Sequence, residues 1–113
     1  MICDCKFYIC TDEGEKFFGK GPYDLLVNVK KYGSLNKAAA EMGLSYHKAL
    51  KLIKTAEKGF GFNLMSKKIG GEKGGGSLLT PEALEIIEKY EKFDKAAEAQ
   101  VCQAFSAVFK SEA

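Results

Sequence analysis

The sequence contains no arginine and no tryptophan, so all 17 of its basic residues are lysines. The lysine ammonium group is a point charge, whereas the planar guanidinium of arginine holds a phosphate or a guanine edge through two hydrogen bonds. This composition excludes bidentate recognition by arginine. Any binding of a polyanion by this chain must depend on single ammonium contacts.

Long hydrophobic runs are also missing from the chain. No apolar stretch approaches the roughly 18 residues of a membrane-spanning helix, and the start, MICDCKFYIC, lacks the charged-then-apolar order of a secretory signal. We therefore expect a soluble, cytoplasmic protein with no membrane partner. With 113 residues and 46% hydrophobic content, the chain can form one compact domain with an extension, but not two independent domains.

Histidine occurs once, and no second histidine or acidic residue lies near it in the sequence to form a catalytic pair. We therefore predict that the protein is not an enzyme. Contact with a base or a phosphate is the functional interpretation of this residue, His47. A packed or solvated side chain is the alternative.

Four cysteines, at positions 3, 5, 10 and 102, raise the question of a metal or redox site. Their spacing matches neither a zinc finger nor a ferredoxin. Alternation along a strand sends Cys3 and Cys5 to one face and Cys10 to the other. Free cysteines that fill apolar space are the favoured interpretation, so no metal and no cofactor are expected. A cysteine-based metal or redox sensor is the alternative.

Charge is segregated along the chain, although the net charge is only +2. Residues 16–73 contain twelve lysines and four acidic residues, a net +8, while residues 1–15 and 74–113 each carry −3. A concentrated basic segment is typical of proteins that bind nucleic acid.

The basic segment contains a stretch, Leu35–Lys54, whose apolar positions and glycine have the spacing of a helix-turn-helix. Ala38 and Ala39 are small enough for two helices to cross closely, and Gly43 tolerates the backbone of the turn. The apolar residues expected to close the core between the helices are Met42, Leu44, Ala49 and Leu52. A helical hairpin without DNA-binding function is the alternative.

The second helix of this motif, Ser45–Lys58, is predicted to enter a major groove as a recognition helix. Ser45 is also its predicted N-cap, as Ser34 is the N-cap of the preceding helix. We expect Tyr46 and His47 to contact base edges. The other DNA contacts expected around this motif, mostly to phosphates, are Ser34, Lys37, Ser45, Lys48 and Lys51.

A β-hairpin and a helix are predicted before this motif. Lys6–Phe18 alternates apolar and polar residues around a turn at Gly14. Glycines and Pro22 then separate it from a helix, Tyr23–Tyr32, that ends at Gly33.

A second hairpin, a wing, is predicted after the recognition helix. Gly59 and Gly61 end that helix, and strands are expected within Phe62–Ile69 and Ser77–Leu79. The intervening GGEKGGGS lacks the ending of a phosphate-binding loop, so nucleotide binding is not expected. The predicted wing contacts with the DNA backbone are Lys67, Lys68 and Lys73. A flexible surface loop is the alternative.

A long C-terminal helix is predicted to begin at Pro81, because Thr80 can cap it and Glu82 favours its first turn. It would run to about Lys110 and span roughly 45 Å, more than a core of this size can cover. Its apolar residues step by three and four, which favours a homodimer over folding back onto the domain. The predicted dimerisation residues are Ile86, Tyr90, Phe93, Ala97, Val101 and Phe105.

Three motifs resemble the N-terminal DNA-binding domain of the ModE family of molybdate-responsive regulators, whose winged helix is related to that of LysR-type regulators. They are EKFFGKGPYDLLVNV, GSLNKAAAEMGLSYHKAL and GGEKGGGSLLTPEA. The resemblance covers about residues 6–105 and implies a homodimer on a palindromic operator. The 113 residues do not contain the molybdate-binding modules of full-length ModE, so no oxyanion site is expected in them. Lysine, at Lys67 or Lys68, stands where arginine is usual in the wing of the family.

The sequence thus predicts a mainly helical α+β protein with a winged helix-turn-helix in residues 1–80 and a long dimerisation helix in residues 81–113. The predicted function is sequence-specific binding of double-stranded DNA as a transcriptional regulator. The residues identify no small-molecule effector. A protein-interaction module that kept the winged-helix scaffold is the second alternative, beside the metal or redox sensor.

Overall fold

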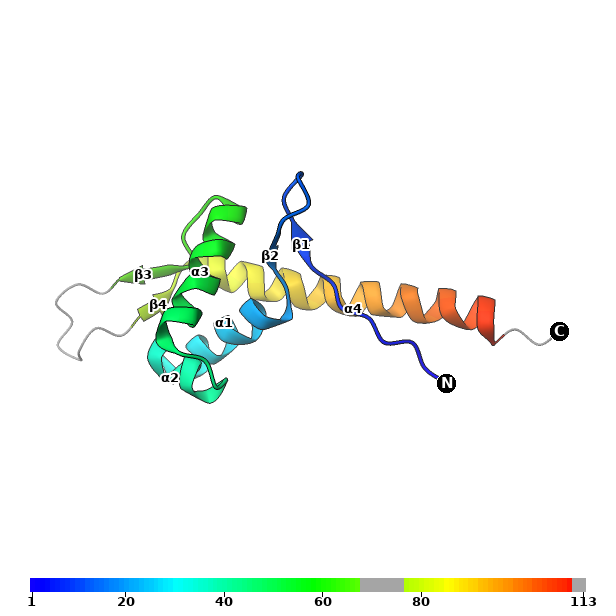
Figure 1. The fold of residues 1–113 in the computed structure, drawn as a ribbon, viewed down its shortest axis with the longest axis horizontal. Helices are drawn as coiled ribbons and strands as arrows, with labels where there is room; N and C mark the ends of the chain where they lie inside the picture. The colour runs from blue at the N-terminus through cyan, green and yellow to red at the C-terminus, as the bar shows by residue number, and fades with distance from the viewer. Residues whose placement is uncertain (68–76, 111–113) are drawn as a thin grey trace.

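The computed structural model of the chain describes residues 1–67 and 77–110. In this part of the chain the elements follow in the order β1 (Ile9–Cys10), β2 (Lys16–Phe18), α1 (Lys20–Tyr32), α2 (Leu35–Glu41), α3 (Tyr46–Phe60), β3 (Met65–Lys67), β4 (Ser77–Leu79) and α4 (Pro81–Phe109). The predicted mainly helical α+β fold, with an N-terminal hairpin and a long C-terminal helix, is confirmed (Figure 1).

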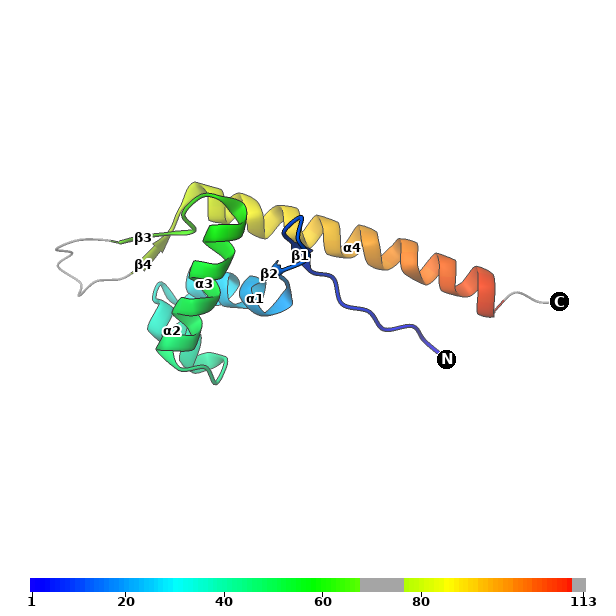
Figure 2. The same cartoon turned by 45° about the horizontal axis from the view of Figure 1, so that its top comes forward.

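The molecule is elongated, because α4 extends well beyond the body formed by the other helices (Figures 1 and 2). Its principal dimensions are 67 × 29 × 23 Å. The radius of gyration is 17.1 Å, against about 13 Å for a compact domain of this size. The β3–β4 hairpin and the free end of α4 therefore lie at opposite ends of the molecule.

One cluster of buried side chains joins the helices to β2, and Met65 and Leu79 of the β3–β4 hairpin pack against it. Its members are Phe18, Leu25, Leu26, Val29, Leu35, Ala38, Ala39, Ala49, Ile53, Ala56, Leu64, Ala83, Ile87 and Tyr90. Ala38, Ala39 and Ala49 are at most 1% exposed where α2 packs against α3, so the expected small-residue contact is confirmed.

The inner face of α3 differs in part from the prediction. Ala49 is buried as expected, but Ile53 and Ala56, four and seven residues later, complete this face of the helix. Leu52 is only half-buried and lies at the edge of the core, as do the other two residues expected to close it, Met42 and Leu44.

The N-terminal hairpin is confirmed, although its strands are short. Ile9 pairs with Phe18 and Cys10 with Lys16 in antiparallel register. Gly14 takes the positive φ of 90° that its turn requires.

α1 begins at Lys20, three residues before the predicted start. The prediction that Pro22 lies before the helix is wrong, because this residue lies in the first turn. Proline fits there, since a first-turn N–H has no partner within the helix and the proline φ is already helical. The predicted end at Gly33, with φ of 71°, is confirmed.

α3 continues through Gly59 to Phe60, and Gly61 is its C-cap. Of the two glycines predicted to end this helix, Gly61 is therefore confirmed and Gly59 is wrong. Gly59 is required for a different reason: an added Cβ would lie 2.1 Å from Cγ of Phe17. The missing side chain lets β2 pack directly on the last turns of α3, where Phe17 meets Phe60 edge to face at 5.0 Å between ring centroids.

The β3–β4 hairpin joins α3 to α4. Met65 pairs with Leu79 and Lys67 with Ser77, so the second strand is confirmed as predicted. The first strand begins later than expected, because the residues before it form the turn out of α3. The predicted end of that strand, Ile69, lies outside the described residues.

Thr80 connects this hairpin to α4. Its N–H donates to the Leu64 carbonyl at 3.0 Å and its hydroxyl donates to the Asn63 carbonyl at 2.8 Å. The same hydroxyl oxygen accepts the Ala83 N–H at 3.1 Å. Thr80 is thus the N-cap of α4 and Pro81 its first residue, as predicted.

Candidate nucleic-acid interface

The turn between α2 and α3 sets the angle at which α3 is presented. Gly43 has φ of 68°, the left-handed conformation that favours glycine. The N–H of Leu44 donates to the Ala39 carbonyl at 2.9 Å, which closes the end of α2. The expected role of Gly43 in the turn is confirmed.

Both predicted serine caps are present. The hydroxyl oxygen of Ser34 accepts the Lys37 N–H at 3.2 Å, and that of Ser45 accepts the Lys48 N–H at 3.1 Å. A serine that accepts a bond in this way can still donate its own proton. A capping serine at the start of α3 can therefore also donate to a phosphate oxygen.

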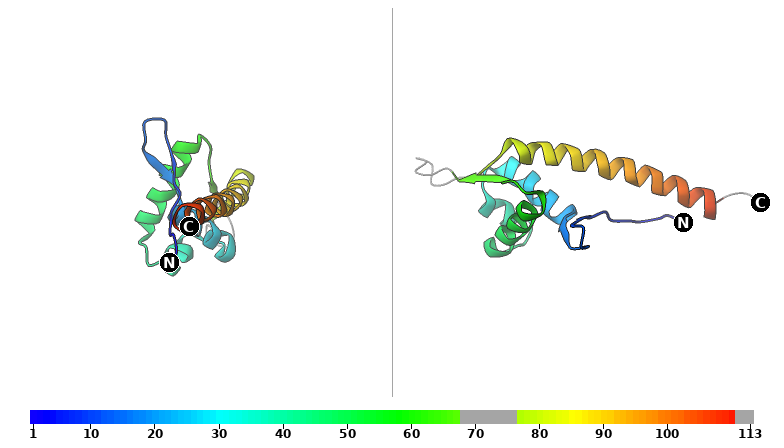
Figure 3. Two further views of the ribbon diagram at one scale, coloured as in Figure 1. Left: turned by 90° about the vertical axis from the view of Figure 1, so that its right-hand side faces the viewer. Right: turned by 90° about the horizontal axis from the view of Figure 1, so that it is seen from above.

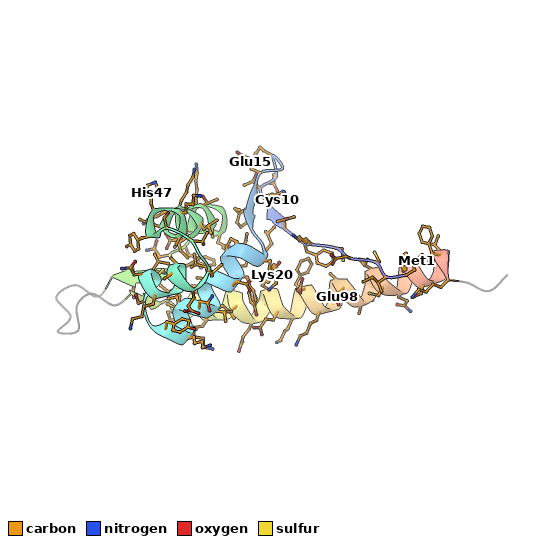
Figure 4. All side chains as sticks on the ribbon, turned by 60° about the horizontal axis from the view of Figure 1, so that its bottom comes forward. Met1, Cys10, Glu15, Lys20, His47 and Glu98 are labelled. Atoms are coloured by element: carbon orange, nitrogen blue, oxygen red, sulfur yellow. The ribbon has the colours of Figure 1, made fainter. Side chains whose placement is uncertain are left out.

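The outer face of α3 carries three of the predicted contact residues, His47, Lys48 and Lys51, and all three are exposed. Figure 4 labels His47 on this helix. At 3.6 residues per turn, Lys54 and Lys58 fall on the same face, and both are exposed. Sequence reasoning missed these two residues. Their spacing of three and seven from Lys51 is the signal that could have found them.

Two further contacts predicted from this motif, Tyr46 and Lys37, are also exposed. Tyr46 is the first residue of α3 and is 50% exposed. Lys37 is exposed on α2, and its N–H is held by the Ser34 cap.

Glu57, the one acidic residue of α3, is turned away from the outer face and is only 12% exposed. Its Oε2 accepts the N–H of Leu64 at 2.8 Å and that of Met65 at 3.4 Å. Its Oε1 lies 3.8 Å from Nζ of Lys54, whose charge it partly offsets. The outer face of α3 therefore presents positive charge without an acidic residue of the same helix.

Of the three predicted wing contacts, the structure describes only the backbone of Lys67. Lys67 ends β3, and its backbone pairs with Ser77. The side chain of Lys67, and all of Lys68 and Lys73, lie outside the part of the chain that the structure describes. Their contact with DNA stays a prediction.

The predicted dimerisation residues divide into two groups along α4. Tyr90 is 4% exposed and belongs to the core of its own chain, which corrects its assignment to an interface. Its ring lies 5.3 Å from that of Phe18 and 5.1 Å from that of Tyr23, between centroids. Ile86 is half-buried against the same core. Steps of three and four occur in any buried helix face, so the spacing alone could not separate the two uses.

The second group lies on the projecting half of α4. Phe93 is 46% exposed, and Ala97, Val101 and Phe105 are half-buried. The segment before β1 leaves the body in the same direction as α4 (Figure 3). It contacts α4 where the Phe7 ring meets that of Phe93 at 5.8 Å. The chain thus covers part of its own apolar stripe.

Cys3 and Cys5 are half-buried and Cys10 is exposed, as expected. The single strand predicted to carry all three is wrong, because β1 begins at Ile9 and residues 1–8 form no strand. Desolvation raises the pKa of the Cys5 thiol, and the neighbouring thiols Cys3 and Cys102 raise it further. A raised pKa leaves less of the thiolate that binds metals and reacts with oxidants. Among the described residues, no three histidine, cysteine or acidic side chains are grouped so that they could hold a metal ion.

None of the described helices is both long enough and apolar enough to cross a bilayer.

The sequence is similar to three known proteins, two of them ModE proteins and one MopB. No model of a known protein family matches the sequence. The chain is 33% identical over 73 residues to the molybdenum transport protein ModE of Herbaspirillum seropedicae, covering 65% of this chain and 27% of that protein. It is 33% identical over 87 residues to the molybdenum-pterin-binding protein MopB of Rhodobacter capsulatus, covering 77% and 31%. It is 30% identical over 74 residues to the transcriptional regulator ModE of Haemophilus influenzae, covering 66% and 29%.

The predicted resemblance is therefore confirmed as a distant similarity, over most of this chain, to ModE regulators and MopB. The chain spans less than a third of the length of each of these relatives. Their names describe a transport protein, a pterin-binding protein and a regulator, and none of the three describes an enzyme.

Proposed function

We propose that this chain, a distant relative of ModE regulators, is a sequence-specific DNA-binding transcriptional regulator of the cytoplasm. Residues 1–80 would form its winged helix-turn-helix and residues 81–113 its dimerisation helix. The outer face of α3 is the observation that carries the proposal. It presents exposed lysines along its length while its one acidic residue is turned inward.

In this proposal α3 enters the major groove. Its 15 residues give about 22 Å of helix, enough to lie along a groove about 12 Å wide. Tyr46 and His47, in its first turn, would contact base edges, because recognition helices read bases mainly through their N-terminal residues. The expected phosphate contacts are Ser34, Lys37, Ser45, Lys48 and Lys51, with Lys54 and Lys58 added.

The β3–β4 hairpin would act as the wing. Lys67, Lys68 and Lys73 would contact the sugar-phosphate backbone beside α3. Glu57 supports this arrangement, because it ties the start of the hairpin to α3.

A homodimer formed through α4 would place two recognition helices on a palindromic site. Apolar exposure on the projecting half supports this step: Phe93 is 46%, Val108 71% and Phe109 66% exposed. Large apolar side chains on one projecting helix are typical of a surface that is buried in an assembly.

A salt titration of DNA binding tests the proposal. The duplex would be selected from random DNA with the full chain, and affinity would be measured from low to high salt. Lys51→Gln and Lys68→Gln should each reduce the slope of log affinity against log salt by about one, because each removes one phosphate contact. Lys92→Gln, on the exposed side of α4, is the control and should leave the slope unchanged.

Absence of affinity for any duplex at low salt would contradict the proposal. It would favour the protein-interaction module, which needs no basic contact face.

A further inference from the structure

A cavity of about 400 Å³ lies between β2, the first turn of α1 and one side of α3. Its lining is largely apolar and aromatic: Tyr8, Phe17, Phe18, Pro22, Leu44 and Leu52. Small-molecule sites are concave, have volumes of about 300–1,000 Å³ and combine an apolar lining with a few polar groups. The cavity has the size and lining of such a site.

Every charged side chain among the lining residues is a lysine. Lys16 and Lys20 stand on the wall formed by β2 and α1, and Lys48 and Lys51 stand on the wall formed by α3. The ammonium of Lys16 lies 4.1 Å from the centre of the Tyr8 ring, and that of Lys20 is 2.9 Å from a carboxylate oxygen of Asp24. The α3 wall therefore supplies the positive charge that a ligand can most readily use.

We propose that this cavity binds a small amphipathic anion, with a flat apolar body and one carboxylate or sulfonate group. The apolar body would cover the aromatic lining and lose its contact with water. The anionic group would pair with Lys48 or Lys51 at the rim, in a charge-assisted hydrogen bond. A cation of the same shape would be repelled by all the charged groups of the lining.

The proposal gives the cavity a regulatory consequence that rests on the proposed function. Lys48 and Lys51 line the cavity and also belong to the face of α3 proposed to contact phosphates. An anion bound to them would compete with DNA for the same charges. Because coupling between two ligands is reciprocal, the anion would weaken DNA binding by the factor by which DNA weakens binding of the anion.

The direct test uses 2-naphthoate as the probe and neutral 2-naphthamide as its matched comparator. Binding to the full chain is followed by NMR through the backbone amides of Gly19, Gly21 and Leu44, which line the cavity. Naphthoate should produce saturable shifts, and naphthamide should bind about tenfold more weakly because it lacks the charge-assisted contact.

Variants locate the site without DNA. The double variant Lys48→Gln, Lys51→Gln should reduce naphthoate affinity to that of naphthamide. Both lysines are exposed, so their replacement leaves the core intact. Lys58→Gln, farther along the same helix and outside the lining, is the control and should bind naphthoate as the unmodified chain does. Leu52→Gln, which places an amide in the apolar wall, should weaken both probes.

Two results would overturn the proposal. One is the absence of saturable shifts at these amides with millimolar naphthoate. The other is that the same amides shift with protein concentration in the absence of naphthoate, since a second copy of the chain would then occupy the cavity.

DNA binding is measured separately, so that the two proposals can fail independently. Saturating naphthoate should weaken binding of the selected duplex about fivefold or more. A saturable naphthoate complex in a protein that binds no duplex would support the cavity site and contradict the DNA-binding proposal. Duplex binding without a naphthoate complex would support the DNA-binding proposal and contradict the cavity site.

Discussion

The Glu57 carboxylate accepts a 2.8 Å hydrogen bond from the backbone N–H of Leu64, which fixes the start of the β3–β4 hairpin to α3. Leu64 is fully buried, so this N–H has little access to water. The contact also turns the acidic side chain away from the outer face of α3. One residue thus positions the proposed wing and keeps the proposed DNA-contact face positive.

Replacement of this carboxylate tests its structural role. Glu57→Ala should lower the free energy of unfolding by about 1.5–3 kcal/mol, because a buried N–H loses a charged acceptor. Glu57→Gln should cost less, since its amide carbonyl can still accept. Urea unfolding monitored by circular dichroism measures the change. Glu85→Ala, which removes an exposed partner of Lys89, is the control and should leave the urea midpoint unchanged. Equal midpoints for Glu57→Ala and the unmodified chain would refute this role.

The contact between Gly59 and Phe17 predicts the sign of the stability change caused by Gly59→Ala. Alanine normally stabilises a helix interior by about 1 kcal/mol relative to glycine. Here an added Cβ would lie 2.1 Å from Cγ of the Phe17 ring, so Gly59→Ala should destabilise the protein instead. Thermal and urea unfolding of the single variant measure the sign of the change.

A double-mutant cycle isolates the cause. Phe17→Ala removes the three atoms that lie nearest to the added methyl, so in this background Gly59→Ala should become stabilising by up to about 1 kcal/mol. The same sign in both backgrounds would show that the ring is not what requires glycine at this position.

These two contacts show which features a sequence can and cannot supply. The helix caps Ser45 and Thr80 and the turn glycine Gly43 act on backbone within a few residues of themselves, so local spacing was sufficient to predict these roles. The bonds of Thr80 to the backbone of Asn63 and Leu64 join distant parts of the chain, and spacing gave no sign of them. Gly59 was taken for a helix end, because the ring that excludes its side chain comes from a strand far away in the sequence. The role of Glu57 depends on how the chain turns back after α3.

In α4, too, some features follow from nearby residues and others depend on distant parts of the chain. Its start and length follow from Thr80, Pro81 and the absence of a breaker. Its apolar residues give no sign of which of them the body of the chain will cover. Tyr90 is consequently a core residue, while Phe93, three residues later, stays 46% exposed.

A pH effect is expected from the contact between α1 and α4. The Tyr23 hydroxyl donates to Glu91 Oε2 at 2.5 Å, and partial burial together with this acceptor raises the pKa of Tyr23 to about 12. An unfolded tyrosine has a pKa of about 10, so the folded state favours the neutral form. The resulting stabilisation is complete below pH 10 and is lost as the pH rises from about 10 to about 12.

Comparison with Tyr23→Phe separates this effect from the lysines, which titrate in the same range. The unfolding free energy of each protein is measured at intervals from pH 9 to pH 12. The advantage of the unmodified chain over Tyr23→Phe should shrink across the upper part of this range. A difference that stays constant throughout would mean that the Tyr23 proton is not linked to folding.

Base recognition and phosphate contact should respond differently to substitution. Tyr46→Ala should reduce the preference for the selected duplex over a scrambled one by about tenfold, because the lost contact is to a base edge. Its salt slope should stay unchanged. Lys51→Gln should weaken both duplexes equally and flatten the slope by about one. If Tyr46→Ala lowered the affinity for both duplexes equally, Tyr46 would not be a residue that contacts base edges.

The projecting half of α4 offers a test of dimerisation that leaves the body of the chain intact. Val108 follows the apolar spacing of the helix and is 71% exposed, so a charge there costs the single chain little. If two α4 helices pack together, Val108→Glu buries a carboxylate in the interface and should raise the dimer dissociation constant at least about tenfold. Sedimentation equilibrium measures the constant, and far-ultraviolet circular dichroism should show unchanged helix content.

Gln103→Glu carries the same charge on the other side of this helix and is the matched control. It should leave the dissociation constant within about twofold of the original, because a solvated charge outside the contact changes association little. Dimers of undiminished stability in Val108→Glu would place the contact between copies elsewhere, with the half-covered positions around Phe93 as the next surface to test. Monomers in the unmodified chain at high concentration would instead leave α4 without a second copy, and recognition of a palindrome would then have no structural basis in this helix.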